Sequence, residues 1–175
     1  FKVLFKNLSL YKTNSRFRLL QIGTAALQAF THGTNDAQKA MGIITMALIA
    51  GGLQTTDEVQ SWVRLACALA MGLGTSVGGY KIIKTVGGKI MKIRPVNGAA
   101  ADLSSASVIF GATLISLPVS TTHVISSAIM GVGAAQRVKG VRWGVARKMV
   151  FTWIITIPIS AVMAAIFYAI LNLIF

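Results

Sequence analysis

The stretch FTHGTNDAQKAMG, residues 30–42, decides how this chain folds, because it places polar side chains inside apolar sequence. The run LLQIGTAALQA precedes it and the run IITMALIAGGL follows it. The apolar segments 19–31 and 41–53 are each too short to cross a bilayer, which takes about 20 helical residues. We therefore expect residues 19–53 to form one long, interrupted transmembrane helix.

The composition is that of a membrane protein. Hydrophobic residues make up 54% of the 175 residues and charged residues only 12%, whereas soluble domains carry about 25% charged residues. The net charge of +13 would suit nucleic acid, but the basic residues lie between apolar segments and no nucleic-acid-binding motif is present, so we expect no such partner. Cys67 stands alone, which excludes an internal disulfide. The chain starts at Phe1 without a signal-peptide pattern, and we expect a fragment or a processed chain.

The basic residues predict a topology. All but Lys39 and Arg64 of the 17 basic residues fall in three clusters, at 1–18, 81–94 and 136–148. Lys and Arg collect on the cytoplasmic side of a membrane, so we place all three clusters there, the first as an interfacial segment and the others as loops. The predicted membrane segments are the interrupted helix 19–53, a helix at 61–80, a helical hairpin at 95–135 and a helix at 149–175. The acidic loop 54–60 and the C-terminus then lie outside.

The polar residues of the first stretch are candidates for a functional site. Charged side chains inside a membrane are costly and usually functional, and Asn35, Asp36 and Lys39 lie between apolar runs. A broken helix at this depth would free backbone groups to bind ions. The alternative is an ordinary helix in which Asp36 and Lys39 form an ion pair three residues apart. His32 and Gln38 are further candidates in the same stretch.

A second candidate site lies in LPVSTTH, residues 117–123. Pro118 removes a backbone donor and ends a helix. Ser120, Thr121 and Thr122 then place three hydroxyls at the start of the next helix, where an oxyanion such as phosphate binds well. The alternative is a simple Ser/Thr cap between two helices. His123 is a weaker candidate, because a lone histidine more often forms a structural hydrogen bond than carries a proton or binds a ligand.

Asp102, in AADLSSASVIF, is a third intramembrane candidate. It suits binding of a cation or a proton, or a structural hydrogen bond to a neighbouring backbone. Two interrupted elements, one acidic and one rich in hydroxyls, favour a secondary transporter. No Ser–His–Asp, HExxH or P-loop pattern indicates an enzyme. An anion channel and a non-transporting scaffold remain alternatives.

Three segments carry a resemblance to a known family. HGTNDAQKAMG, DLSSASVIFGATLISLPVSTTHVISSAIMGVG and RWGVARKMVFTWIITIPISAVMAAI resemble the second half of inorganic phosphate transporters of the Pit family. The resemblance implies an all-α integral membrane fold built as an inverted repeat. This chain would be one half, the C-terminal repeat, with a broken signature helix, a re-entrant helical hairpin and flanking transmembrane helices.

The resemblance also implies roles for individual residues. Ser120, Thr121 and Thr122 would bind phosphate, and Asn35 and Asp36 would bind phosphate or the coupling cations. Asp102 matches a position that is usually Glu in the family, which leaves a coupling role for it open.

The segment NDAQKA resembles the bacterial low-affinity type, which implies symport of phosphate with H⁺, with coupling to Na⁺ as the alternative. Phosphate would travel with Mg²⁺ or another divalent cation as a neutral complex, without a cofactor. The Lys39 ammonium would then neutralise Asp36 or phosphate in place of sodium. We expect arsenate to mimic the substrate, the missing N-terminal repeat to be the partner, with a homodimer as the alternative, and the location to be a bacterial plasma membrane.

Overall fold

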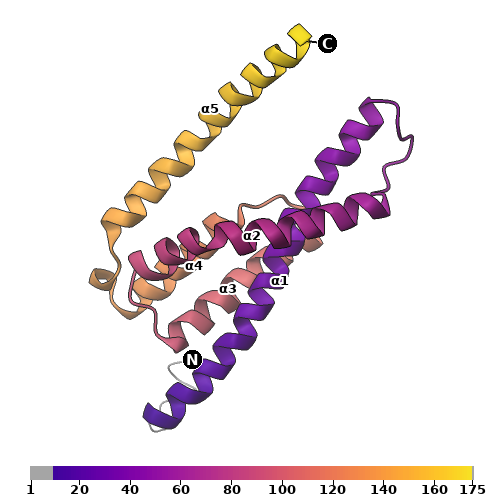
Figure 1. The fold of residues 1–175 in the computed structure, drawn as a ribbon. Helices are drawn as coiled ribbons and strands as arrows, with labels where there is room; N and C mark the ends of the chain where they lie inside the picture. Colours follow the sequence, from indigo (N-terminus) through magenta and orange to yellow (C-terminus); the bar gives the residue numbers. More distant parts are fainter. Residues whose placement is uncertain (1–9, 175) are drawn as a thin grey trace. The chain divides into compact units, whose positions relative to one another are not determined.

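The computed structural model describes residues 10–174, and every regular element among them is helical. In chain order these elements are α1 (Leu10–Ala50), α2 (Ser61–Lys89), α3 (Pro95–Leu114), α4 (Thr121–Gln136), the short 3-10 helix η1 (Val138–Gly140) and α5 (Trp143–Ile174) (Figure 1). They divide into two units, one ending at Val141 and the other starting at Arg142. The all-α prediction is confirmed for the described residues.

α1 is one continuous helix of 41 residues, so the predicted interruption of the signature helix is wrong. Gly33 and Gly42 each weaken a helix by about 1 kcal/mol relative to alanine, but neither removes a backbone donor as proline would. Polar side chains also need no helix break to be satisfied. Thr31, for example, returns its hydroxyl to the carbonyl of Gln28 at 3.1 Å.

α1 packs chiefly against α3, and three hydrogen-bonded pairs cross this interface (Figure 1). The pairs are Thr24 with Asp102 (3.4 Å), Gln28 with Ser105 (2.8 Å) and Asn35 with Thr113 (3.0 Å). The partners advance together along both helices, so α1 and α3 run parallel. Polar side chains in an apolar surrounding need partners within the protein, and this ladder supplies them and sets the register of the two helices.

The connection between α3 and α4 is a defined turn rather than a loose loop. Ser116 has a positive φ of 56°. Its N–H bonds to the carbonyl of Thr113 at 3.1 Å, and the N–H of Leu117 bonds to the carbonyl of Ala112 at 2.9 Å. These two bonds form a Schellman motif, which ends α3. Pro118 follows, and its ring prevents the chain from resuming the same helix.

The open end of the hairpin is closed by an amide pair and a close contact. Asn97 of α3 and Gln136 of α4 exchange side-chain hydrogen bonds, one of them at 3.1 Å. A Cβ atom at Gly133 would lie 2.7 Å from both Met91 Sδ and Val141 Cγ2. Glycine at this position therefore lets α4 approach the segments that precede α3 and follow η1.

α2 continues to Lys89, so the expectation of a loop over all of 81–94 is wrong for residues 81–89. A lysine in the last turn suits the negative end of the helix dipole, which favours continuation of the helix through this basic stretch. Gly74 and Gly78 lie four residues apart on one face of α2, and neither packs against a neighbouring backbone. No atom lies within 4 Å of a Cβ built at Gly74 or Gly78, and both line an apolar cavity of about 1060 Å³.

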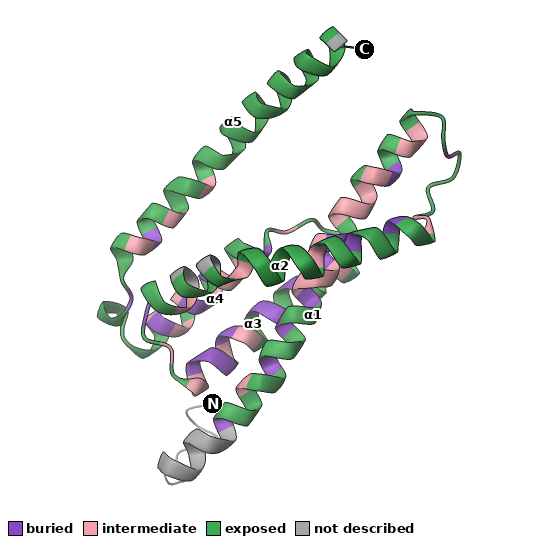
Figure 2. Cartoon of the chain, viewed as in Figure 1, coloured by how far each residue is buried: buried purple, intermediate pink, exposed green. Residues whose placement is uncertain are grey.

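α5 forms the second unit and is exposed along most of its length (Figure 2). Its helix starts at Trp143, within the basic cluster that was expected to be a loop to residue 148. The second unit begins at Arg142, and the helix runs from Trp143 through Arg147 and Lys148 into the long apolar segment that follows. Among the described residues, the segment Trp143–Leu173 is the helix long and apolar enough to cross a membrane by length and composition.

Candidate functional site

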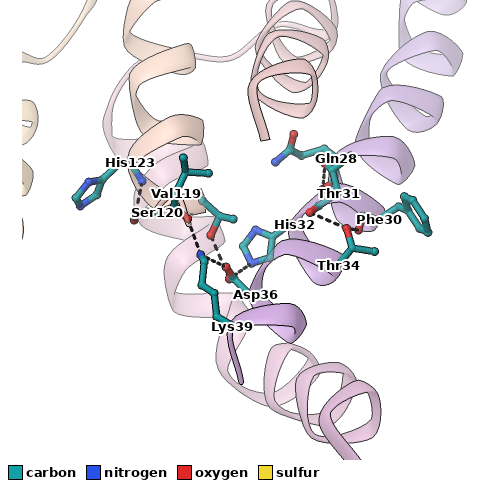
Figure 3. A network of polar contacts seen from close by, with 11 residues as sticks. Gln28, Phe30, Thr31, His32, Thr34, Asp36, Lys39, Val119, Ser120 and His123 are labelled. Carbon is teal, nitrogen blue, oxygen red and sulfur yellow. Dashed lines mark hydrogen bonds and ion pairs between the residues drawn. The ribbon is translucent and has the colours of Figure 1, made fainter. Parts of the chain in front are cut away.

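Asp36 is the centre of a polar cluster between α1 and the start of α4 (Figure 3). Its Oδ1 lies 2.9 Å from Lys39 Nζ, and its Oδ2 lies 3.2 Å from His32 Nε2. Residues four before and three after a position share its helix face, which brings the His32 imidazole and the Lys39 ammonium to one carboxylate. Thr121 Oγ1, from α4, donates a third bond to Oδ2 at 3.1 Å. Asp36 therefore links α1 to α4 and also binds His32 and Lys39 of its own helix.

Lys39 connects α1 to the turn that precedes α4. Besides Asp36, its ammonium donates to the main-chain carbonyl of Val119 at 2.5 Å (Figure 3). The alternative left open by the sequence, an Asp36–Lys39 pair in an ordinary helix, is thus what the structure has. The pair also has partners outside its own helix, on the hairpin.

The start of α4 combines a capped turn with exposed hydroxyls. Ser120 is the N-cap, and its Oγ accepts from the N–H of His123 at 3.4 Å. This is the capping arrangement that the sequence left open, and it coexists with unused donors, because the first N–H groups of a helix have no partner within the helix. Thr121 is buried at 4% exposure, whereas Thr122 is exposed.

Two hollows lie side by side at this junction, and both are lined by Lys39 and Pro118. The first, of about 400 Å³, is lined by Asp36, Lys39 and residues 118–122. The second, of about 360 Å³, is lined by Asn35, Gln38, Lys39, Thr113 and residues 116–118. The first hollow faces the positive end of α4, and the second lies at the carboxyl end of α3, which carries the opposite partial charge.

The structure does not bring Asp102 into this cluster. Its carboxylate accepts from Thr24, which precedes Asp36 on α1 by about 18 Å along the helix axis. Asp102 instead lines the apolar cavity next to α2, which His32 also lines. Of the other candidates, His32 is a direct partner of Asp36, Gln38 is exposed at the second hollow, and His123 joins through its backbone N–H.

The α1–α3 ladder is the part of the site region that sequence reasoning missed. The residues Thr24, Gln28, Thr31 and Asn35 are all buried, with exposures between 1% and 8%. Their spacing of three or four residues places them on one face of a helix. This spacing was visible in the sequence and predicts a polar interface for α1. The Val119 carbonyl gave no sequence signal, because every residue has one.

The fold and the site define a class of helical protein in which a charged cluster faces the break in a helical hairpin, an arrangement typical of secondary transporters. The family model described as "Phosphate transporter family" matches residues 6–164. The chain belongs to this family, whose members are transporters and not enzymes. The resemblance found in the sequence, including its bacterial low-affinity type, is confirmed.

Similar proteins support this assignment. A Bacillus subtilis (strain 168) protein named "Probable low-affinity inorganic phosphate transporter" is 69% identical over 175 residues, which cover 99% of this chain and 53% of that protein. A protein of the same name from Rhizobium meliloti (strain 1021) is 45% identical over 94% of this chain and 50% of its own length.

A solved structure, "The sodium-dependent phosphate transporter", matches with a TM-score of 0.84 and 31% identity, over 99% of this chain and 44% of that one. The chain thus spans about half the length of the relatives it matches.

Proposed function

We propose that this chain forms the C-terminal repeat of a symporter that carries inorganic phosphate across a bacterial plasma membrane, driven by a proton gradient. The observation that carries the proposal is the hollow of about 400 Å³ where Lys39 meets the start of α4. A helix N-terminus with free N–H groups and neighbouring hydroxyls suits an oxyanion, and a lysine adds a full positive charge beside it.

The proposed phosphate ligands are Ser120, Thr121 and Thr122, together with Asn35 and Asp36 of α1. Thr121 has one hydroxyl proton, and in this structure Asp36 accepts it. Phosphate would have to take this donor from Asp36, so the carboxylate occupies the anion site until the substrate arrives. Protonation of Asp36 would weaken its hold on Lys39 and favour that exchange, which gives the proton a role in coupling.

The coupling residues that we propose are therefore Asp36 and Lys39, with His32 as the neighbour that shares Oδ2. Asp102 does not contact the Asp36 cluster. If Asp102 takes part in coupling, it would do so through the cavity that both Asp102 and His32 line. Phosphate carried as a neutral complex with Mg²⁺ would avoid moving excess negative charge through the membrane.

The active unit in this proposal needs the rest of the transporter. One half-site is present here, and the second repeat would close it from the other side. The basic segments would face the cytoplasm and the C-terminus the outside, as Lys and Arg bias predicts. Arsenate, with the shape and charge of phosphate, would compete for the same hollow.

A sodium-coupled symporter is the second candidate, and the observation that favours it is the likeness to the solved sodium-dependent transporter. The experiment that separates the two uses the full-length parent protein in proteoliposomes. Labelled phosphate uptake is measured under a proton gradient or a sodium gradient, with and without Mg²⁺. Saturable, concentrative uptake that needs the proton gradient supports the proposal, and uptake driven by sodium alone supports the second candidate.

A matched pair of variants tests the site. Thr122→Val removes a hydroxyl from the hollow, and loss of one hydrogen bond to a charged group, about 1.5–3 kcal/mol, is a drop in phosphate affinity of roughly tenfold or more. Thr152→Val makes the same change on α5, where the hydroxyl bonds to the carbonyl of Lys148, and should leave affinity unchanged. Non-saturable, downhill flux would indicate a channel, and absence of phosphate binding would indicate a scaffold.

A further inference from the structure

The Lys39 ammonium lies among oxygens of the kind that bind metal cations. Its two acceptors are a carboxylate oxygen of Asp36, at 2.9 Å, and the main-chain carbonyl of Val119, at 2.5 Å. Carboxylates and backbone carbonyls are the usual ligands of hard cations. The carbonyl comes from the turn before α4, where the backbone is outside any helix (Figure 3).

A third oxygen, Oδ1 of Asn35, has no hydrogen-bond partner among the described residues. Thr113 Oγ1 donates its one proton to the carbonyl of Ile109 at 2.9 Å, so it can only accept from Asn35. That requirement orients the Asn35 amide with Nδ2 toward Thr113 and Oδ1 away from it. Asn35 is 3% exposed, and its Oδ1 is buried without a hydrogen bond among the described residues. The Asn35 residue lines the hollow of about 360 Å³ that Lys39 also lines.

The ammonium is held in place by the covalent chain. Lys39 follows Asp36 by three residues in a continuous helix, so its side chain reaches the carboxylate within one turn. A cation tethered in this way competes with ions from solution at a high effective concentration. Lys39 also lines both hollows.

We propose that Lys39 is a built-in cation that permanently occupies a cation position formed by Asp36, Val119 and Asn35. With the ammonium in place, Asp36 is neutralised without an ion from solution. Replacing Lys39 by a shorter neutral residue opens that position to a small monovalent cation such as Na⁺. The inference deepens the proposed function, on which it rests for the phosphate site next to it.

The experiment has an arm without phosphate, so that its failure differs from failure of the proposed function. The full-length parent in detergent is melted in NaCl or in choline chloride at equal ionic strength. The wild type should melt at the same temperature in both salts. Lys39→Asn should melt at a higher temperature in NaCl, with a saturable dependence on Na⁺, because an ion that binds only the folded state stabilises it.

The second arm measures phosphate affinity in the same salts. Wild type and Lys39→Arg should be insensitive to Na⁺, whereas Lys39→Asn should bind phosphate roughly tenfold more tightly with Na⁺ than with choline. Lys84→Met, at an exposed lysine of α2, controls for loss of one positive charge and should behave as wild type. Lys39→Ala, which is shorter than lysine and a strong helix former, serves if the asparagine variant does not fold.

Two results would overturn the proposal. One is a wild type already stabilised by Na⁺, which would mean that the ammonium does not fill the position. The other is a folded Lys39→Asn or Lys39→Ala protein whose melting temperature and phosphate affinity do not respond to Na⁺. A wild type that binds no phosphate would instead refute the proposed function, and the melting arm would still test the cation position.

Discussion

Neutralising both partners of the Asp36–Lys39 pair should cost less stability than the two single changes together. Asp36→Asn leaves the Lys39 ammonium without a charged partner, and Lys39→Met leaves the carboxylate with Thr121 and His32. At 2.9 Å and an effective dielectric constant of about 20, the charges attract by about 6 kcal/mol before desolvation is subtracted. The Asp36 side chain is 26% exposed and the Lys39 side chain 34% exposed. The net coupling free energy should therefore lie between two limits. Surface pairs contribute about 0.2–1 kcal/mol, and breaking a buried pair costs about 3–5 kcal/mol.

We therefore expect each single variant to lose about 1–3 kcal/mol of unfolding free energy, and the double variant to recover about 1–2 kcal/mol of the sum. The assay is chemical unfolding of the full-length parent in detergent micelles, in choline buffer so that no sodium replaces the lysine. Lys84→Met is the control for loss of charge alone. Strictly additive losses would refute the reasoning, since they would mean that the two side chains do not stabilise each other.

Three further changes test the packing around the site. Gly133→Ala pushes a methyl group against Met91 and Val141 and should destabilise the protein by about 1–3 kcal/mol. Gly131→Ala, with no atom within 4 Å of its Cβ, should leave stability unchanged or raise it. Thermal melting distinguishes the two variants. Ser105→Ala removes the donor to Gln28 and should lower the free energy of unfolding by about 1–3 kcal/mol, because it leaves a buried amide oxygen unpaired. Adding Gln28→Leu should restore part of that free energy. No recovery in the double variant would argue against the ladder. Asp102→Asn keeps an acceptor for Thr24 and lies far from Asp36. Phosphate affinity, measured by equilibrium binding, should therefore stay within about twofold of wild type. A tenfold loss of affinity would place Asp102 in the binding site.

Part of the candidate site was predictable from residue types and spacing. Asp36 and Lys39 stood out because charges inside apolar sequence are costly and need partners. Pro118 followed by hydroxyl residues predicted a helix start that suits an anion, and α4 does begin at Thr121. The three-residue spacing of Asp36 and Lys39 already indicated that they could form an ion pair, because such residues share a helix face.

Other parts depended on contacts that no local pattern encodes. Asp102 resembled Asp36 in the sequence, yet it faces Thr24 far from the cluster, because the register of α3 against α1 decides which side chains meet. The bond from Thr121 to Asp36 joins residues 85 positions apart, and the Val119 carbonyl is part of the common backbone. Only the packing of the hairpin on α1 brings these groups together.

The sequence by itself determined the membrane class, the all-helical fold and the break at Pro118, because composition, periodicity and a missing backbone donor act locally. The tertiary structure decided that α1 runs unbroken through the polar stretch. The polar side chains of this stretch have partners without any break in the helix, because Thr113 and Thr121 of the hairpin bond to Asn35 and Asp36. Those partners lie 78 and 85 residues away along the chain, so only long-range packing decides how the polar stretch is satisfied.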